Sequence, residues 1–252
     1  MTLSFSIPAH NESKNINACL EAIRREAAVA EVAVEIVVID NASQDDTALV
    51  AQKVPGVRVV REEQKGLLFA RQRGFRETTG ELIANIDADT LLTSGWIKKV
   101  LQEFESDPKL VALSGPYIYH DLSWWPRFVT KLFYGVAYGI HAVAHLFLGK
   151  AALLQGGNFI VRRSALEAIG GFNTNLSFYG EDTDIAKRIS VMGKVKFSFD
   201  LPALTSGRRL AKEGVFLTGW RYAINHFWVI FFDRPFTASY EDVRGDSQHV
   251  QK

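Results

Sequence analysis

Blocks of apolar and polar residues alternate through the first third of the chain, and their spacing predicts strands that alternate with helices. Short apolar runs are expected as strands at 3–8, 34–39, 57–60 and 82–87. Apolar residues at helical spacing predict helices at 16–23, 48–53 and 66–78. Such an alternation with short links is typical of a parallel sheet with right-handed crossovers. The pattern therefore predicts an α/β fold with a mostly parallel central sheet flanked by helices.

Polar residues follow the ends of three of these predicted strands. The loop Pro8–Glu12 follows the first strand, Asp40 follows the second, and Asp87 and Asp89 follow the fourth. A single acid at a strand end is commonly a turn former. The carboxyl ends of parallel strands meet at one edge of a sheet, however, so these groups are expected to line one crevice. Two carboxylates there suit Mg²⁺ or Mn²⁺ carrying a diphosphate.

Composition narrows the class of protein. The 252 residues suffice for one large domain or two fused halves, and a net charge of +1 gives no basic field, so no nucleic-acid partner is expected. Cys19 is the chain's single cysteine and cannot form an internal disulfide, which favours a reducing compartment. The first residues lack the charged and apolar regions of a signal peptide. A cytoplasmic protein is therefore expected.

Common phosphate-binding motifs are missing from the chain. Neither the G-x-G-x-x-G fingerprint nor the G-x-x-x-x-G-K-[ST] loop occurs. A bound diphosphate would therefore need other positive groups. A metal on Asp89, helped by Arg71 or Arg73 from the helix at 66–78, would supply them. The alternative for both arginines is a solvated helix face, which is common for arginine.

Several separated motifs carry a resemblance to a known family. They are Ile7–Glu12, Val37–Thr47, Lys65–Gly66 with Ala70–Gly74, Gly80–Glu81 leading to Asp87–Asp89, Gly156–Asn158, Gly170–Phe172 and Gly180–Asp184. Over about residues 3–200 the chain resembles the family 2 glycosyltransferases of the GT-A fold. This resemblance implies a Rossmann-like α/β domain that transfers a sugar with inversion and with the help of a divalent metal.

The resemblance also implies roles for individual residues. The nucleotide sugar would be bound by Pro8, Ala9, Asn11, Glu12, Asp40, Arg71, Asp87 and Asp89. Asp89 would bind Mg²⁺ or Mn²⁺, whose charge stabilises the departing diphosphate. The donor or acceptor sugar would be contacted by Gly157, Asn158 and Glu181. Gln72 stands where the family usually has an asparagine.

Asp182 is the catalytic base that the resemblance implies. An inverting transfer needs one carboxylate to take the proton from the acceptor hydroxyl as it attacks the sugar. The alternative is that Glu181, Asp182 and Asp184 only occupy the positive end of a helix expected at 185–191. Both roles are compatible.

The late part of the chain departs from the processive members of the family. Their Q-x-x-R-W signature is absent, and the corresponding region reads Thr205–Arg209. We therefore expect one transfer per acceptor. Arg208 and Arg209 either clamp a donor or acceptor phosphate or form a basic surface turn. No late histidine is expected to complete the metal site.

Two stretches, 124–148 and 216–236, are both aromatic and basic. The first has the spacing of an amphipathic helix, which would lie on a membrane surface, pack internally or form a homodimer interface. Its lysine and two histidines disfavour a membrane span. His141 and His145 lack a third ligand, which disfavours a zinc site. Together the stretches suggest a lipid-linked acceptor or docking on the inner face of a membrane, with aromatic core packing as the alternative.

These observations predict a glycosyltransferase domain at 1–215 and an aromatic, basic segment and tail at 216–252. The domain would divide into a nucleotide-binding half at 1–92 and an acceptor half at 93–215. The predicted function is transfer of a single sugar from a UDP- or GDP-sugar to a glycan or lipid-linked acceptor. The alternatives are a nucleotidyltransferase of sugar phosphates, which usually opens with a glycine-rich basic loop, and a catalytically silent sugar-nucleotide or lipid-docking module.

Overall fold

The computed structural model describes residues 1–148, 153–176, 179–232 and 234–237. Inside the longest helix, the side chains of residues 137 and 140–148 are outside this description. The predictions about His141 and His145 therefore lie outside the described residues.

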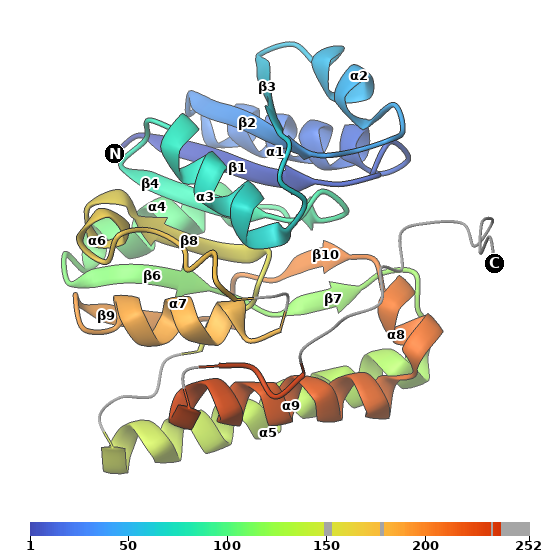
Figure 1. Ribbon diagram of the computed structural model, residues 1–252. Helices are drawn as coiled ribbons and strands as arrows, with labels where there is room; N and C mark the ends of the chain where they lie inside the picture. The colour runs from blue at the N-terminus through green and yellow to red at the C-terminus, as the bar shows by residue number, and fades with distance from the viewer. Residues whose placement is uncertain (149–152, 177–178, 233, 238–252) are drawn as a thin grey trace.

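The order of elements confirms the predicted alternation, with shifts at the element ends (Figure 1). The strands are β1 (Leu3–Ala9), β2 (Val34–Asn41), β3 (Val57–Glu62), β4 (Leu82–Ile86), β5 (Leu91–Leu92), β6 (Leu110–Ser114), β7 (Tyr117–Tyr119), β8 (Asn158–Arg162), β9 (Lys194–Phe197) and β10 (Ala203–Thr205). The helices are α1 (Ile16–Ala30), α2 (Thr47–Gln52), α3 (Leu67–Glu77), α4 (Trp96–Ser106), α5 (Trp124–Leu148), α6 (Arg163–Ala168), α7 (Glu181–Ile189), α8 (Arg208–Glu213) and α9 (Val215–Phe232).

The central sheet of the described residues has seven strands in the order β3-β2-β1-β4-β8-β6-β9. Strand β1 lies inside the sheet and pairs in parallel with both β2 and β4. Only β8 among these strands runs antiparallel to its neighbours, β4 and β6. A small sheet in the order β5-β10-β7 continues from the end of β4. The mostly parallel sheet predicted from the sequence is confirmed.

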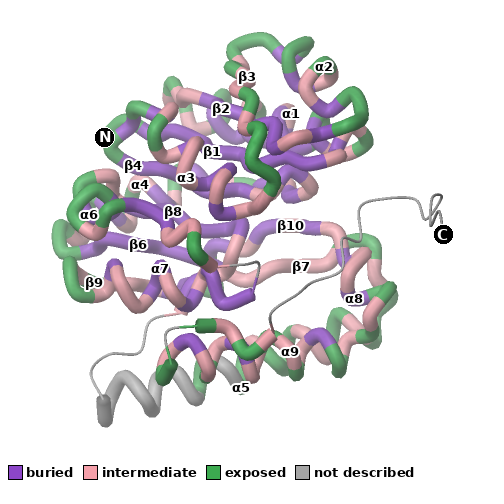
Figure 2. Tube along the Cα trace, viewed as in Figure 1, coloured by how far each residue is buried: buried purple, intermediate pink, exposed green. Residues whose placement is uncertain are grey.

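Alternation along β1 explains how the sheet is covered. Leu3, Phe5 and Ile7 point to one face and pack in the core beneath α1 and α4. Ser4 and Ser6 point to the other face, where a Cβ on Gly74 of α3 would lie 1.9 Å from Oγ of Ser6. Small residues on both sides of this contact let α3 approach the strand closely. Figure 2 shows the inner strands β1, β4, β6 and β8 buried, whereas the edge strands β3 and β9 are partly exposed.

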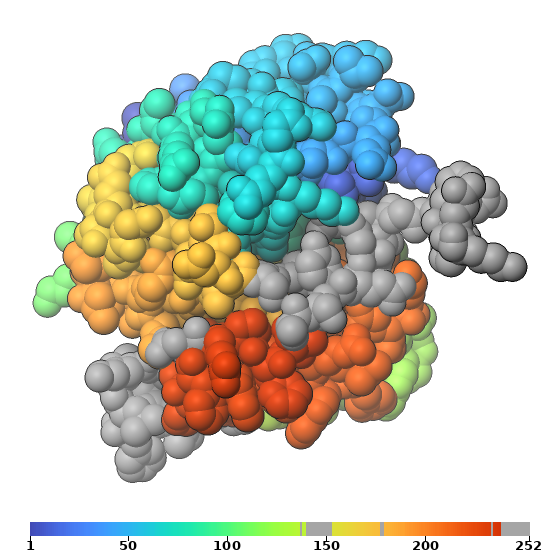
Figure 3. Space-filling model, viewed as in Figure 1, coloured from blue at the N-terminus to red at the C-terminus, as the bar shows by residue number. Residues whose placement is uncertain are grey.

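Helices α5 and α9 lie side by side along the lower edge of the molecule in Figure 1, away from the central sheet. In the space-filling view of Figure 3, α9 covers the lower part of the visible surface. None of the helices in the described part of the chain has the length and hydropathy needed to cross a bilayer.

Candidate active site

A cleft of about 150 Å³ opens where β1 and β4 end. Five residues predicted to bind the donor line it: Pro8, Ala9, Glu12, Asp87 and Asp89. Its other walls come from the loop before α3, from β7 and β10, and from the start of α8 and α9. The structure therefore brings together strand ends that are far apart in the sequence, as the parallel-sheet pattern predicts.

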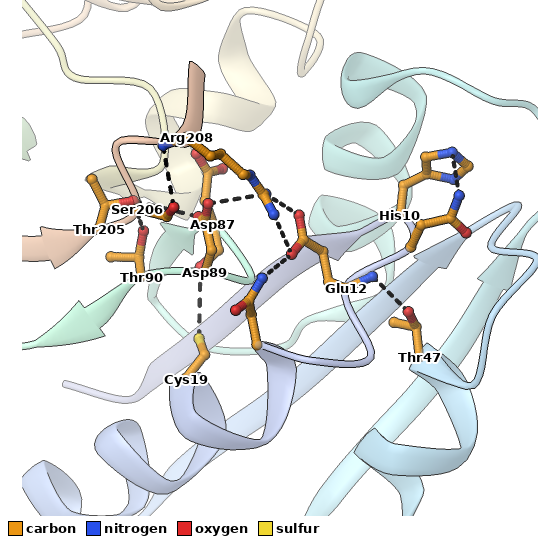
Figure 4. A network of polar contacts seen from close by, with 12 residues as sticks. His10, Glu12, Cys19, Thr47, Asp87, Asp89, Thr90, Thr205, Ser206 and Arg208 are labelled. Carbon is orange, nitrogen blue, oxygen red and sulfur yellow. Dashed lines mark hydrogen bonds and ion pairs between the residues drawn. The ribbon is translucent and has the colours of Figure 1, made fainter. Parts of the chain in front are cut away.

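Arg208 joins two acids of this cleft (Figure 4). Its guanidinium donates to both carboxylate oxygens of Glu12, with 3.1 Å between Nη1 and Oε2, and lies 3.0 Å from Oδ2 of Asp89. The small sheet positions it, because β10 ends at Thr205, whose hydroxyl lies 3.4 Å from Oδ1 of Asp89. Arg208 is therefore paired inside the cleft, and the surface-turn alternative is wrong for it.

Asp87 is held by two partners. Nη2 of Arg71 lies 3.5 Å from its Oδ1, and the hydroxyl of Tyr117 lies 3.2 Å from its Oδ2. The same hydroxyl lies 2.6 Å from the carbonyl oxygen of Gly156. Gly157 has φ +79°, and a Cβ there would lie 2.1 Å from the carboxylate of Asp87. A glycine is required at this position because the backbone passes directly against the acid.

Arg71 connects Asp87 to the acids at the start of α7. Its side chain is 1% exposed, donates to Glu181 and lies 5.2 Å from the ring centre of Phe159. Burial raises the pKa of Glu181 to about 7, although the charge of Arg71 opposes the shift; Asp182 adds to it. Arg71 therefore couples the two acidic groups and lies behind the wall of the cleft.

Helix α7 begins at Glu181, four residues before its predicted start, so Glu181, Asp182 and Asp184 occupy its first turn. Oδ1 of Asp182 accepts a hydrogen bond of 2.8 Å from the backbone of Thr183. The hydroxyl of Thr183 lies 2.8 Å from Nδ1 of His226 on α9. Burial lowers the pKa of His226, and the nearby charge of Asp182 opposes that shift. Asp182 thus lies in the first turn of α7, near α9.

The loops after β1 and β2 are tied together beside the cleft. Asn11 has φ +52°, its backbone donates to Oγ of Ser43 at 3.0 Å, and its Oδ1 accepts from the backbone of Gln44 at 2.8 Å. Asp40 is buried and paired with Arg61, while its Oδ1 has no hydrogen-bond donor among the described residues. Asn11 therefore shapes the loop, and Asp40 keeps one acceptor atom unused.

Three residues singled out in the sequence use their side chains in hydrogen bonds or ion pairs within the protein. Asn158 is buried, accepts from Nε1 of Trp96 at 3.1 Å and donates to two backbone carbonyls, so its contact with a sugar stays a prediction. Oε1 of Gln72 accepts from the backbone of Phe172 at 2.8 Å, which accounts for the glutamine in this motif. Arg73 pairs with Glu77 at 3.0 Å on the surface of α3.

The acids of the cleft suit a cation that arrives with its diphosphate. Within the part of the chain that the structure describes, no group of three or more His, Cys, Asp or Glu residues is arranged to hold a metal ion by itself. Mg²⁺ commonly uses one or two protein carboxylates and completes its shell with substrate phosphates and water. Asp87 and Asp89 can provide the protein's share of such a shell.

Sequence reasoning gave no role to Tyr117 or His226, and it found Thr183 only as part of the motif Gly180–Asp184. Tyr117 lies in a three-residue strand, and His226 lies in an apolar helix where nothing distinguishes it from a packed core residue. Their contacts join segments that are distant in the sequence, so local patterns carry no signal for them.

The strand order and the cleft at the strand ends are those of a GT-A glycosyltransferase fold. A mannosyltransferase from Pyrobaculum calidifontis, solved with GDP-Man and Mn²⁺, has a TM-score of 0.66 at 24% identity and covers 89% of this chain and 61% of that one. Glucosyl-3-phosphoglycerate synthase from Mycobacterium tuberculosis, solved with Mn²⁺ and UDP-glucose, has a TM-score of 0.59 at 19% identity, covering 90% and 78%. These likenesses confirm the predicted fold.

The family model described as glycosyl transferase family 2 matches residues 4–170, and the chain belongs to that family. Dolichol-phosphate mannosyltransferase from Pyrococcus furiosus is 29% identical over 177 residues, which is 67% of this chain and 48% of that protein. Glucosyl-dolichyl phosphate glucuronosyltransferase from Haloferax volcanii is 25% identical over 126 residues, 48% of this chain and 38% of that protein. The matches thus span less than half the length of these relatives. The family predicted from the motifs is confirmed.

Proposed function

We propose that this protein transfers one sugar from a UDP- or GDP-sugar to an acceptor, with inversion at the sugar and with Mg²⁺ or Mn²⁺. The observation that carries the proposal is the gathering of Glu12, Asp87 and Asp89 around one cleft, with the acids of α7 joined to it through Arg71. A cleft built from strand ends with several acids is what a metal-bound diphosphate requires.

The donor half of the site has a group for each part of the nucleotide sugar. The free Oδ1 of Asp40 suits an N–H group of a nucleobase, because a buried acceptor without a donor is unfavourable. Asp89, with Asp87 beside it, would hold the cation, which supplies positive charge to the departing diphosphate. Arg208 is close enough to transfer its hydrogen bonds from Glu12 and Asp89 to a phosphate oxygen.

The transfer step uses Asp182 as the base. The acceptor oxygen attacks the anomeric carbon from the side opposite the diphosphate, its proton passes to Asp182, and the bond between sugar and diphosphate breaks. The nucleoside diphosphate leaves with the electron pair of that bond. Asp182 is half-buried and is not among the residues that line the cleft. Burial and, to a smaller extent, the charge of Asp182 raise the pKa of Tyr222, which does line the cleft, and this proximity supports Asp182 as the base.

The acceptor is proposed to be lipid-linked, with a soluble glycan as the alternative. The names of two curated relatives describe transfer involving dolichyl phosphates, which supports a lipid acceptor for this chain. The cytoplasmic location of the protein and its association as a homodimer stay predictions.

A donor panel tests the function. The purified protein is incubated with UDP-, GDP- and dTDP-sugars, with Mn²⁺, Mg²⁺ or EDTA, and with a membrane lipid extract. We expect one nucleotide class to be consumed, only with a divalent cation, and the sugar to appear in the lipid fraction. Consumption of none of the donors would refute the proposal.

The metal role is tested separately by thermal unfolding. We expect UDP or GDP to stabilise the protein only together with Mn²⁺ or Mg²⁺, and Asp89→Asn to abolish that stabilisation. Asp200→Asn is the matched control, because its side chain is 79% exposed and lies outside the cleft. A full metal-dependent shift in Asp89→Asn would remove the proposed role of Asp89.

A further inference from the structure

Helices α5 and α9 form a second feature that the donor cleft does not explain. They touch along their length, and a Cβ on Gly219 of α9 would lie 3.9 Å from the ring of Phe133 on α5. We propose that the outer faces of these two helices form one surface that binds an anionic lipid bilayer. This inference goes beyond the transfer reaction and depends on no particular donor or acceptor.

Helix α9 has two opposite sides. Each residue advances about 100° around a helix, so Thr218, Asn225 and Val229, which are all buried, share one side. Four exposed aromatic residues share the opposite side: Phe216, Trp220, Phe227 and Phe231. Phe216 is 75% exposed and Trp220 is 68% exposed, so this aromatic side contacts nothing in the described part of the chain that would cover it.

Helix α5 is arranged in the same way. Tyr134 and Tyr138 face the catalytic domain, with their ring centres 6.2 and 6.4 Å from that of Phe197. The backbone N–H of Tyr117 donates to the Tyr134 hydroxyl at 3.3 Å, and that hydroxyl donates to Oε1 of Gln155 at 2.6 Å. The opposite side carries four apolar residues that are each more than half exposed: Trp125, Phe128, Leu132 and Val136.

The two exposed sides form one continuous surface. The inner sides of both helices pack on the same domain, and the helices contact each other laterally, so their outer sides point away from the domain together (Figure 1). We call this the α5–α9 surface, formed by Trp125, Phe128, Leu132, Val136, Phe216, Trp220, Phe227 and Phe231. An exposed apolar patch of this extent on a protein surface marks an interaction site.

Charge favours an anionic bilayer as the partner. Neither α5 nor α9 contains Asp or Glu, and α5 carries the exposed Arg127 and Lys131. Arg221 of α9 is paired with Glu213 of α8 at 2.9 Å, so the basic groups of this region come from α5. Aromatic residues beside basic ones are typical of helices that lie in the interface of a membrane. A second copy of the chain is a poorer partner, because pairing of two α5–α9 surfaces would bring Arg127 and Lys131 of one copy near the same residues of the other.

The surface also explains how a membrane-bound acceptor would meet the donor. Thr218 and Tyr222 on the inner side of α9 line the cleft. A helix is about 10 Å thick, so the donor would lie roughly that far above a bilayer on which α9 rests. One helix thus connects the proposed membrane surface to the cleft.

Vesicle binding without any donor tests the inference. The full chain is sedimented with vesicles of phosphatidylcholine alone and of phosphatidylcholine with phosphatidylglycerol, and tryptophan emission is recorded. We expect binding to the mixed vesicles with a blue shift, and much weaker binding to the neutral ones. Phe128→Ser combined with Trp220→Ser should weaken binding at least ~100-fold, about tenfold per aromatic ring removed, or about 1.4 kcal/mol each.

Matched variants distinguish binding through the α5–α9 surface from non-specific hydrophobic adsorption. Val191→Ser removes an apolar side chain that is 80% exposed elsewhere, and it should bind as the wild type does. Arg127→Gln with Lys131→Gln should weaken binding to the mixed vesicles only, by about fivefold per charge. Unchanged thermal unfolding of each variant shows that folding is intact.

Two results would overturn the inference. The first is wild-type binding by the Phe128→Ser, Trp220→Ser variant. The second is no binding of the wild type to the mixed vesicles. If the wild type is then a dimer in solution that this variant dissociates, the surface belongs to a second copy of the chain. Neither result bears on sugar transfer, since no donor is present.

Discussion

Replacing Arg208 by alanine should expose how the acids of the cleft are balanced. Its guanidinium neutralises Glu12 and Asp89, whose side chains are only 4% and 14% exposed. Breaking a buried ion pair costs about 3–5 kcal/mol, because the remaining charge is left without a partner. The side chain of Arg208 is 29% exposed, which places the expected loss of folding free energy near 2–3 kcal/mol. For a chain of this size, that lowers Tm by about 4–12 °C.

A divalent cation should repair this loss in the variant. Without Arg208, Glu12 and Asp89 lose the guanidinium that both contact, and these neighbouring carboxylates then favour Mn²⁺ even when no nucleotide is present. A cation at a concentration of 100 times its Kd would restore about 2.7 kcal/mol of the free energy of unfolding. In the wild type Arg208 already fills this position, so Mn²⁺ alone should change Tm little.

Thermal unfolding in EDTA and across a Mn²⁺ titration measures both effects. Arg24→Ala is the control, because Arg24 pairs with Glu21 on the exposed surface of α1 and such pairs contribute about 0–1 kcal/mol. The reasoning is refuted if Arg208→Ala keeps the wild-type Tm, or if Mn²⁺ without nucleotide stabilises the wild type as much as the variant.

Two further predictions concern the start of α7. Asp182→Asn should bind donor normally and turn over at least ~100-fold more slowly, as expected on loss of a general base. Asp184→Asn, in the same helix turn, is the control. Near-normal turnover by Asp182→Asn would place the base elsewhere. The second concerns Glu181, whose pKa of about 7 lies above the ordinary 4.5, so its contribution to stability is full below pH 4.5 and is lost as pH rises through 7. Urea unfolding between pH 5 and 8 should show the wild type losing about 3 kcal/mol relative to Glu181→Gln. His226 has a lowered pKa, so its contribution to stability increases with pH, and this contribution is the same in both proteins. The difference between the two proteins therefore reports Glu181 alone. Parallel plots of unfolding free energy against pH would contradict the prediction.

The fold and half of the cleft could be predicted because both follow from local patterns. Apolar runs such as Leu3–Ala9 define strands, and parallel strands place their carboxyl ends at one edge. That reasoning brings Glu12, Asp87 and Asp89 together without any knowledge of strand order.

The rest of the site depends on contacts between distant segments. The position of Arg208 follows from pairing of β10 with β5, which lies more than a hundred residues earlier, and no local pattern reports that pairing. Family motifs identify Asn158 and Arg71 but do not show that their side chains are buried behind the cleft. Burial is a property of packing, so a motif can identify a residue and leave its contacts open.

The acids of the site are paired with arginines that differ in their freedom to move. Arg71 is 1% exposed and lies between Asp87, Glu181 and the ring of Phe159, so it cannot leave without exposing buried charge. Arg208 is partly exposed, belongs to a short helix and reaches Asp89 from the rim of the cleft. Arg71 therefore fixes the geometry between Asp87 and Glu181. Under the proposed function, Arg208 would give its place to a cation and bind the diphosphate instead. Arg208→Ala should consequently alter cation binding, whereas loss of Arg71 should alter the position of Asp87 itself.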